Sequence, residues 1–206
     1  MMDKTIKLAN FTLEALKNAG ATDASCIVKI NNDLEVTAEI MELTQLRNVA
    51  QKTEISLQAF VGKKMATIKV GSSDEAEIKA AATNCVEIAK ASKDDDGHAM
   101  NDSGNEIVLK NAGGALDTEK LIAYTAKYLE DIAKEYKTIS LRRATVVHKD
   151  SAEVYKNTFG TTIISPSAHY GFSNMFIAVE ANKMSSSSGA ALNSWSLISL
   201  SLKRAW

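Results

Sequence analysis

The sequence predicts an α+β fold in which antiparallel strands pack against helices on one face. Two observations predict this class. Residues 53–70 alternate apolar and polar side chains on both sides of a turn at 61–64, which is typical of a β-hairpin, and an amphipathic helix follows at once. The order of a helix followed by long alternating strands then recurs after residue 106. We therefore expect two α+β halves.

The first half begins with a helix over residues 4–19, and Gly20 is suited to the left-handed residue that ends it. Alternation predicts strands at 24–31 and 34–40, separated by a turn at 31–33. Residues 41–52 are less regular, and we assign them to a strand because strands flank them on both sides.

The hairpin at 53–70 leads into the helix, for which Ser72 and Glu75 have the spacing of a capping box. Its apolar stripe follows the helical repeat and includes Cys85. Cys26 and Cys85 both fall on apolar faces, so we expect reduced core residues, and a disulfide would require the first strand to meet this helix.

The second half follows a polar loop at 93–105. We expect a short strand at 106–110 and a helix capped by Asp117 that runs to about Tyr136. Strands are predicted at 138–148, 172–181 and 192–202, with turns at 149–151 and 157–160, a loop containing Pro166 and another loop at 185–189. The predicted domains are residues 1–100 and 101–206.

Composition excludes several classes of function. The 24 Lys and Arg residues nearly balance the 25 Asp and Glu residues, and aromatic residues make up 6% of the chain. Neither number favours binding to nucleic acid or to an anionic membrane. The N-terminus has no long apolar stretch of a signal peptide, and no run approaches a membrane span, so we expect a cytoplasmic protein.

No complete active site can be assembled from local motifs. The three histidines, at 98, 148 and 169, lie far apart in the sequence, so no local zinc site is expected. The acidic run at 94–96 lacks the spacing of an EF-hand loop, and nucleophile-elbow and phosphate-loop motifs are missing. We expect Arg142 and Arg143 to protect a sheet edge. The chain is therefore predicted to carry no catalytic, metal-binding or cofactor-binding residue.

Several strings together resemble the N-terminal part of the TldD/PmbA family, the modulators of DNA gyrase. They are LANFTLEALKNAGATDASCIV, LEVTAEIMELTQL, SLQAFVGKKMATIKVGS and the helix that begins at DEAEIKAAA. The string EVYKNTFG is similar to a family strand that ends in an Asn-Ser-x-Gly turn, with Asn157 and Gly160 in place and Thr158 where serine is usual. The ending ANKMSSSSGAALNSWS is more similar to the PmbA (TldE) branch.

The resemblance implies the N-terminal scaffold or partner portion of a metallopeptidase that degrades unfolded or modified peptides. The histidine motif of the zinc-bearing branch is missing, and the resemblance implies zinc in a family partner subunit. The expected partner is a zinc-bearing TldD-like chain or a second copy of this chain. Family members are about twice as long, so we expect a chain truncated before a C-terminal β domain. The alternative is a stand-alone interaction protein that regulates a longer partner.

The expected site for an unfolded peptide is the edge of the last long strands. An extended peptide can add to an open strand edge, where backbone hydrogen bonds give tolerance of sequence. The residues that we expect to form this edge are Phe176, Ile177, Ala178, Ile198 and Leu200. Self-association through such open edges is the other expected consequence.

Overall fold

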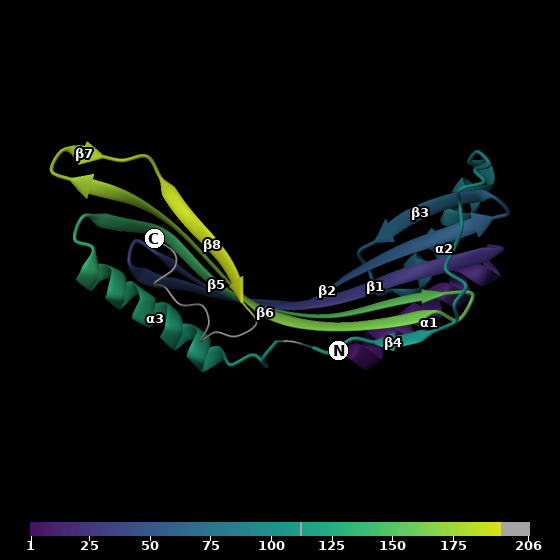
Figure 1. The fold of residues 1–206 in the computed structure, drawn as a ribbon, viewed down its shortest axis with the longest axis horizontal. Helices are drawn as coiled ribbons and strands as arrows, with labels where there is room; N and C mark the ends of the chain where they lie inside the picture. The colour runs from purple at the N-terminus through teal and green to yellow at the C-terminus, as the bar shows by residue number, and fades with distance from the viewer. Residues whose placement is uncertain (112, 195–206) are drawn as a thin grey trace. The chain divides into compact units, whose positions relative to one another are not determined.

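A computed structural model describes residues 1–111 and 113–194 and, within these, every side chain except those of 49–51. Three helices and a mixed sheet form this part of the chain (Figure 1). The predicted α+β class is confirmed. The elements in order are α1 (Met2–Asn18), β1 (Asp23–Glu39), β2 (Glu42–Val61), β3 (Lys64–Val70), α2 (Glu75–Ala91), β4 (Glu106–Val108), α3 (Thr118–Glu135), β5 (Ile139–Asn157), β6 (Thr162–Glu180), β7 (Lys183–Met184) and β8 (Ser188–Ser194).

The strand order in the sheet is β3-β2-β1-β5-β6-β4, and β7 and β8 also pair with β6. The hairpin of β2 and β3 is antiparallel and brings Ile55 opposite Val70, as the alternation at 53–70 predicts. β6 pairs antiparallel with β8, whereas the short β4 pairs with β6 in parallel. No helix in the described part of the chain is long and apolar enough to cross a membrane.

Helix α1 ends as the sequence predicts. Gly20 has a φ of +98°, and its N–H donates to the carbonyl of Lys17. The N–H of Ala21 donates to the carbonyl of Leu16, which completes a Schellman motif and satisfies the last carbonyls of the helix.

The predicted capping box of α2 is wrong, because Asp74 caps this helix in place of Ser72. The Asp74 carboxylate accepts hydrogen bonds from the N–H groups of Ala76 and Glu77. Ser72 lies two residues before Asp74, and its hydroxyl accepts a hydrogen bond from the N–H of Asp74. A carboxylate next to the first turn also faces the positive end of the helix dipole, which favours it over a hydroxyl.

Three predicted interruptions of strands are wrong. β1 continues through residues 31–33 and β5 continues through residues 149–151, because pairing with neighbouring strands outweighs the turn preference of Asn, Asp and Ser. Pro166 lies inside β6, between the part that pairs with β4 and the part that pairs with β8. Proline is tolerated where a strand is locally at an edge, since no partner needs its missing N–H.

The described residues divide into two compact units that interleave along the sequence. Unit 1 contains Met1–Asn31, Gln51–Asn111 and Ser151–Pro166, and the described part of unit 2 contains Asn32–Ala50, 113–150 and 167–194. The long strands β1, β2, β5 and β6 contribute to both units. The predicted domains, residues 1–100 and 101–206, have other bounds than these two units, and they stay a prediction.

Each unit has its own apolar core, in which helices cover one face of the strands. In unit 1, α1 and α2 pack on alternate residues of β1 and β2, among them Cys26, Val28, Ile55 and Leu57. In unit 2, α3 packs on Leu34, Val36, Ala38, Leu141, Ala144, Val146 and Phe172. Alternate residues point to the same face of a strand, which explains the core positions of β1 and β2. β5 departs from strict alternation, because Leu141 and Ala144 are both buried although they are three positions apart.

The turn between β1 and β2 is strained. Ile40 and Met41 form it with φ values of +48° and +65°, which Gly and Asn adopt readily and a β-branched residue does not. Ile40 is also 68% exposed, so packing returns little of the cost. Such a backbone conformation costs roughly 1–3 kcal/mol in a non-glycine residue.

We therefore expect Ile40→Asn to stabilise the monomer by about 1 kcal/mol, because asparagine tolerates this conformation. Urea unfolding followed by circular dichroism measures the change at a protein concentration low enough to keep the chain monomeric. Leu43→Asn, which replaces an exposed apolar residue of ordinary conformation, is the control. An equal gain in the control would show that lost surface hydrophobicity, and not relief of strain, is responsible.

Candidate functional site

Strand β6 carries the predicted peptide-binding residues Phe176, Ile177 and Ala178, but it is not an open edge there. Phe176 lies opposite Ser188 of β8. The N–H of Ala178 donates to the Ser185 hydroxyl at 2.9 Å, and the Ala178 carbonyl accepts from the N–H of Ser185. The chain folds back through β7 and β8 onto β6, so its own backbone occupies the side on which a peptide strand was expected to add.

The side chains of the three predicted residues differ in exposure. Ile177 is buried, Phe176 is half-buried against the core of unit 2 and Ala178 is exposed. Ile198 and Leu200, the other two predicted residues, lie outside the described residues. Peptide binding at these five positions stays a prediction, and addition to β6 would first require β8 to move away.

A groove of about 620 Å³ lies in unit 1 over β1, β2, β3 and β5. Its walls include residues that alternate with the core positions, so they face away from α1 and α2. Ile27, which is 41% exposed, supplies apolar surface within the groove. Sequence reasoning missed this groove, although the charged residues of neighbouring strands, Lys29, Lys52, Glu54 and Lys69, are a signal that it could have used.

Charges of both signs line the groove. Lys52 bonds to Glu54 at 2.8 Å, and Lys29 lies 3.9 Å from Glu153. The Lys52 ammonium, through its hydrogen bond and its charge, lowers the pKa of the Glu54 carboxyl below its usual range. Lys69 adds a third cation. The groove therefore offers cations, carboxylates and the hydroxyl of Ser56 to a polar, extended ligand.

The described part of the chain shows no group of three or more His, Cys, Asp or Glu residues that could hold a metal ion. His148 is buried, its Nε2 lies 3.2 Å from the carbonyl of Gly114, and its ring packs edge-on against Tyr170 at 4.7 Å. The Tyr170 hydroxyl donates to the carbonyl of Ala115. These two side chains fix the segment that leads into α3, which is a structural role.

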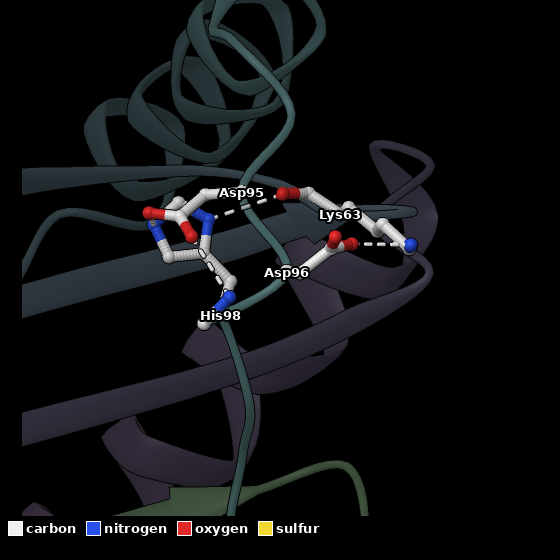
Figure 2. A network of polar contacts seen from close by, with 5 residues as sticks. Lys63, Asp95, Asp96 and His98 are labelled. Carbon is white, nitrogen blue, oxygen red and sulfur yellow. Dashed lines mark hydrogen bonds and ion pairs between the residues drawn. The ribbon is translucent and has the colours of Figure 1, made fainter.

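His98 and the acidic run fix a loop to the hairpin of β2 and β3 (Figure 2). The Lys63 carbonyl accepts from the N–H of Asp95 at 3.1 Å and contacts Nδ1 of His98 at the same distance. Lys63 extends its ammonium to Asp96, and His98 lies 3.6 Å from the Asp95 carboxylate. His98 is thus a partly buried anchor of the loop.

The turn that resembles the family's Asn-Ser-x-Gly motif is a dense set of hydrogen bonds. Asn157 is buried, and its amide nitrogen donates to the carbonyl of Asn101 at 2.7 Å. Its amide oxygen accepts from the N–H groups of Phe159 and Thr161. Gly160 has a φ of +88°, which explains the glycine. The Thr158 hydroxyl accepts from the N–H of Ala24, a role that serine could also fill.

Both cysteines are free and buried, as the sequence predicts. The Cys26 thiol donates to the carbonyl of Ala9, and burial raises its pKa to about 12, although Lys156 acts in the opposite direction. The Cys85 thiol lies near the carbonyls of Leu57 and Ala66. Inert thiols of this kind contribute to packing and not to catalysis.

Burial of Cys26 predicts a loss of stability at alkaline pH. The folded-state pKa of the Cys26 thiol is raised. The neutral thiol therefore contributes its full stabilisation of the fold below the unfolded-state pKa of about 9, and this stabilisation is lost as the pH rises toward 12. Urea unfolding between pH 8 and 11 measures this loss. Cys26→Ala removes the titrating thiol and should show a shallower decline, and identical pH profiles would contradict the prediction.

Arg143 bonds to Glu39 at 2.9 Å, and Arg142 contacts the sulfur of Met184 at 4.0 Å. Both arginines are exposed on β5, which lies between β1 and β6 and is not an edge strand. The prediction that the pair protects a sheet edge is therefore wrong. The alternation of side chains along a strand does not show whether that strand lies at an edge or in the interior of the sheet.

Comparisons with solved structures identify the fold. TldE from Thermococcus kodakarensis matches over 93% of this chain and 43% of its own length, with a TM-score of 0.69 and 11% sequence identity. A candidate modulator of DNA gyrase from Thermotoga maritima matches over 95% of this chain and 44% of its own length, with a TM-score of 0.71 and 13% sequence identity. A second candidate modulator, from Bacteroides thetaiotaomicron, matches over 98% of this chain and 48% of its own length, with a TM-score of 0.75 and 14% sequence identity.

No protein-family model and no curated protein sequence matches the chain. The structural matches nevertheless show the fold that the resemblance to the TldD/PmbA family implied. The chain spans a little less than half the length of these solved chains.

Proposed function

We propose that this chain is the N-terminal scaffold and partner portion of a TldD/PmbA-type metallopeptidase that acts on unfolded or modified peptides. The observation that carries the proposal is the structural match to TldE and two candidate gyrase modulators, which extends over 93–98% of this chain. In this proposal zinc and the catalytic groups belong to a TldD-like partner subunit.

The chemistry of the described side chains favours a scaffold role over a catalytic one. His98 and His148 are used in loop contacts, both thiols are buried, and no cluster of metal ligands occurs among these residues. The groove over β1, β2, β3 and β5 supplies what a peptide-handling subunit needs, which is apolar surface together with charges of both signs. Such a surface accepts many peptide sequences, because it can bond to backbone groups and to charged side chains.

The test begins with affinity capture of the tagged chain in lysate of its source, followed by mass spectrometry and a zinc assay of the eluate. We expect a stoichiometric zinc-bearing chain of the same fold, and hydrolysis of an unfolded protein substrate that chelation abolishes. Lys69→Glu reverses a charge of the groove and should raise KM for the peptide, while Lys79→Glu, on the opposite side of unit 1, should leave it unchanged.

Two outcomes would contradict the proposal. One is capture of no zinc-bearing chain, with this chain running as a self-contained oligomer, which would favour the alternative of a stand-alone interaction protein. The other is peptide hydrolysis by this chain alone that survives chelation, which would place a catalytic site within these residues.

A further inference from the structure

The groove over β1, β2, β3 and β5 carries a surplus of positive charge. Its charged lining consists of three lysines, Lys29, Lys52 and Lys69, and two carboxylates, those of Glu54 and Glu153. The lysines come from β1, β2 and β3, which are neighbours in the sheet. The whole chain has a formal net charge of −1, so the surplus is a local property of this face of unit 1.

The two carboxylates leave one lysine uncompensated. Lys52 bonds to Glu54 at 2.8 Å, and Lys29 lies 3.9 Å from Glu153, which is a long ion pair. Lys69 is exposed and forms no ion pair with any described residue. The pKa of the Glu54 carboxyl is lowered mainly by Lys52 and further by the charges of Lys29 and Lys69. All three lysines therefore act on the same part of the groove.

Apolar surface and a hydroxyl lie beside these lysines. Ile27 is 41% exposed and stands two positions before Lys29 on β1, so the two side chains share a face of the strand. Ser56 lies opposite Lys69 in the register of β2 and β3, and side chains of such cross-strand pairs are neighbours. The groove thus combines apolar contact, a hydrogen-bonding hydroxyl and an ammonium group without an ion-pair partner in the described chain.

Gly71 keeps one end of the groove open. It lines the groove directly after the last residue of β3, and a Cβ added to it would meet no atom within 4 Å. Its φ lies outside the left-handed region, so a residue with a side chain fits this backbone without strain. A large side chain at this position would therefore fill the groove from its end and leave the sheet intact.

We propose that this groove binds an extended peptide segment with a Glu or Asp side chain at Lys69 and an apolar side chain on Ile27. β1 and β3 lie two strand spacings apart, about 10 Å, and residues two apart in an extended peptide share a face at a separation of about 7 Å. The flexible stem of Lys69 spans the difference. The inference rests on the proposed function, to which it adds the class of peptide.

The lining favours this ligand over other charged ligands. A carboxylate at Lys69 gains a charge-assisted hydrogen bond from an ammonium group that the described chain leaves without an ion pair. A nucleic acid would bring successive phosphates against Glu54 and Glu153, which repel them. A basic peptide would meet the surplus of lysines and two carboxylates that are already paired.

Fluorescence anisotropy with the full chain measures the preference. The probes are a labelled peptide of four Glu-Ser-Leu repeats and its Gln-Ser-Leu counterpart, both with blocked ends. We expect the acidic peptide to bind about fivefold more tightly than the neutral one at about 20 mM salt. The difference should fall below about twofold at about 500 mM salt, because salt screens interactions between exposed charges.

Two pairs of variants test the charges. Lys69→Met should weaken binding of the acidic peptide about threefold and leave binding of the neutral peptide unchanged. Lys17→Met removes an exposed lysine of α1, which covers the other face of the sheet, and should change neither. Glu153→Gln removes a carboxylate of the groove and should strengthen binding of the acidic peptide about twofold. Glu87→Gln on α2 changes the net charge equally and should have no effect.

Gly71→Phe tests the location. We expect it to weaken binding of both peptides at least tenfold without changing the circular dichroism spectrum or the melting temperature. Gly114→Phe is the matched control, because a Cβ at Gly114 also meets no atom within 4 Å and this residue belongs to unit 2. Its binding of the peptides should equal that of the wild-type chain.

The outcomes distinguish this inference from the function on which it rests. Equal binding of the two peptides, with loss of both in Gly71→Phe, would overturn the acidic preference and leave a peptide-handling groove. Binding of the acidic peptide that Gly71→Phe and Lys69→Met do not weaken would overturn the location. Binding of neither peptide would overturn the inference altogether, whereas failure to capture a zinc-bearing partner would count against the proposed function alone.

Discussion

Replacing Asn157 by alanine is expected to lower the free energy of unfolding by about 2–4 kcal/mol, because it removes four hydrogen bonds in a buried position. The carbonyl of Asn101 and the N–H groups of Phe159 and Thr161 would lose their partner. An unpaired buried polar group costs more than the bond contributes, and the bond from the N–H of Thr161 is buried. Urea unfolding followed by circular dichroism measures the loss.

Two matched variants separate the contributions at this turn. Asn157→Asp keeps the acceptor oxygen but removes the amide donor and places a carboxylate against the carbonyl of Asn101, so we expect a loss close to that of alanine. Thr158→Ser keeps the hydroxyl that accepts from the N–H of Ala24 and should change stability by less than about 0.5 kcal/mol. An unchanged free energy of unfolding in Asn157→Ala would show that the turn does not stabilise unit 1.

The same turn illustrates what the sequence could predict. Asn157 and Gly160 stood out through resemblance to a family motif, and their roles are local, since one bonds to the turn backbone and the other adopts a positive φ. The bond from Asn157 to Asn101 joins residues 56 positions apart. A single sequence contains no signal for such a pair, because each side chain alone is compatible with an exposed turn.

The predicted ends of strands were wrong where pairing between strands outweighed the local preference of the sequence for a turn. The asparagines of residues 31–33 favour a turn in isolation, yet β1 is an interior strand that lies between β2 and β5 in the sheet. The same limit applies to the predicted peptide-binding edge, at which peptide binding itself stays a prediction. Alternation marked β6 as a strand but could not show that the chain returns through β8 to cover residues 170–176. Which strand lies at an edge is a property of the topology.

Truncating Tyr128 to alanine is expected to lower the free energy of unfolding by about 3–5 kcal/mol, the largest single effect in unit 2. This side chain of α3 is fully buried and meets the Phe172 ring edge-on, with centroids 4.9 Å apart. Its hydroxyl accepts from the Asn174 amide at 2.7 Å, and the Asn174 oxygen accepts from the N–H of Ala190 in β8. One side chain thus connects α3 to β6 and, through Asn174, to β8.

Tyr128→Phe separates packing from the hydrogen bond. It keeps the ring against Phe172 and removes the acceptor of Asn174, so we expect a smaller loss of about 1–2 kcal/mol. The alanine variant also tests how the two units are coupled, because the strands β1, β2, β5 and β6 contribute to both. Amide hydrogen exchange should show faster exchange in α1 as well as in α3 if the shared strands make unfolding cooperative. Acceleration confined to residues of unit 2 would show that the units unfold separately, and an unchanged stability would contradict the role of Tyr128.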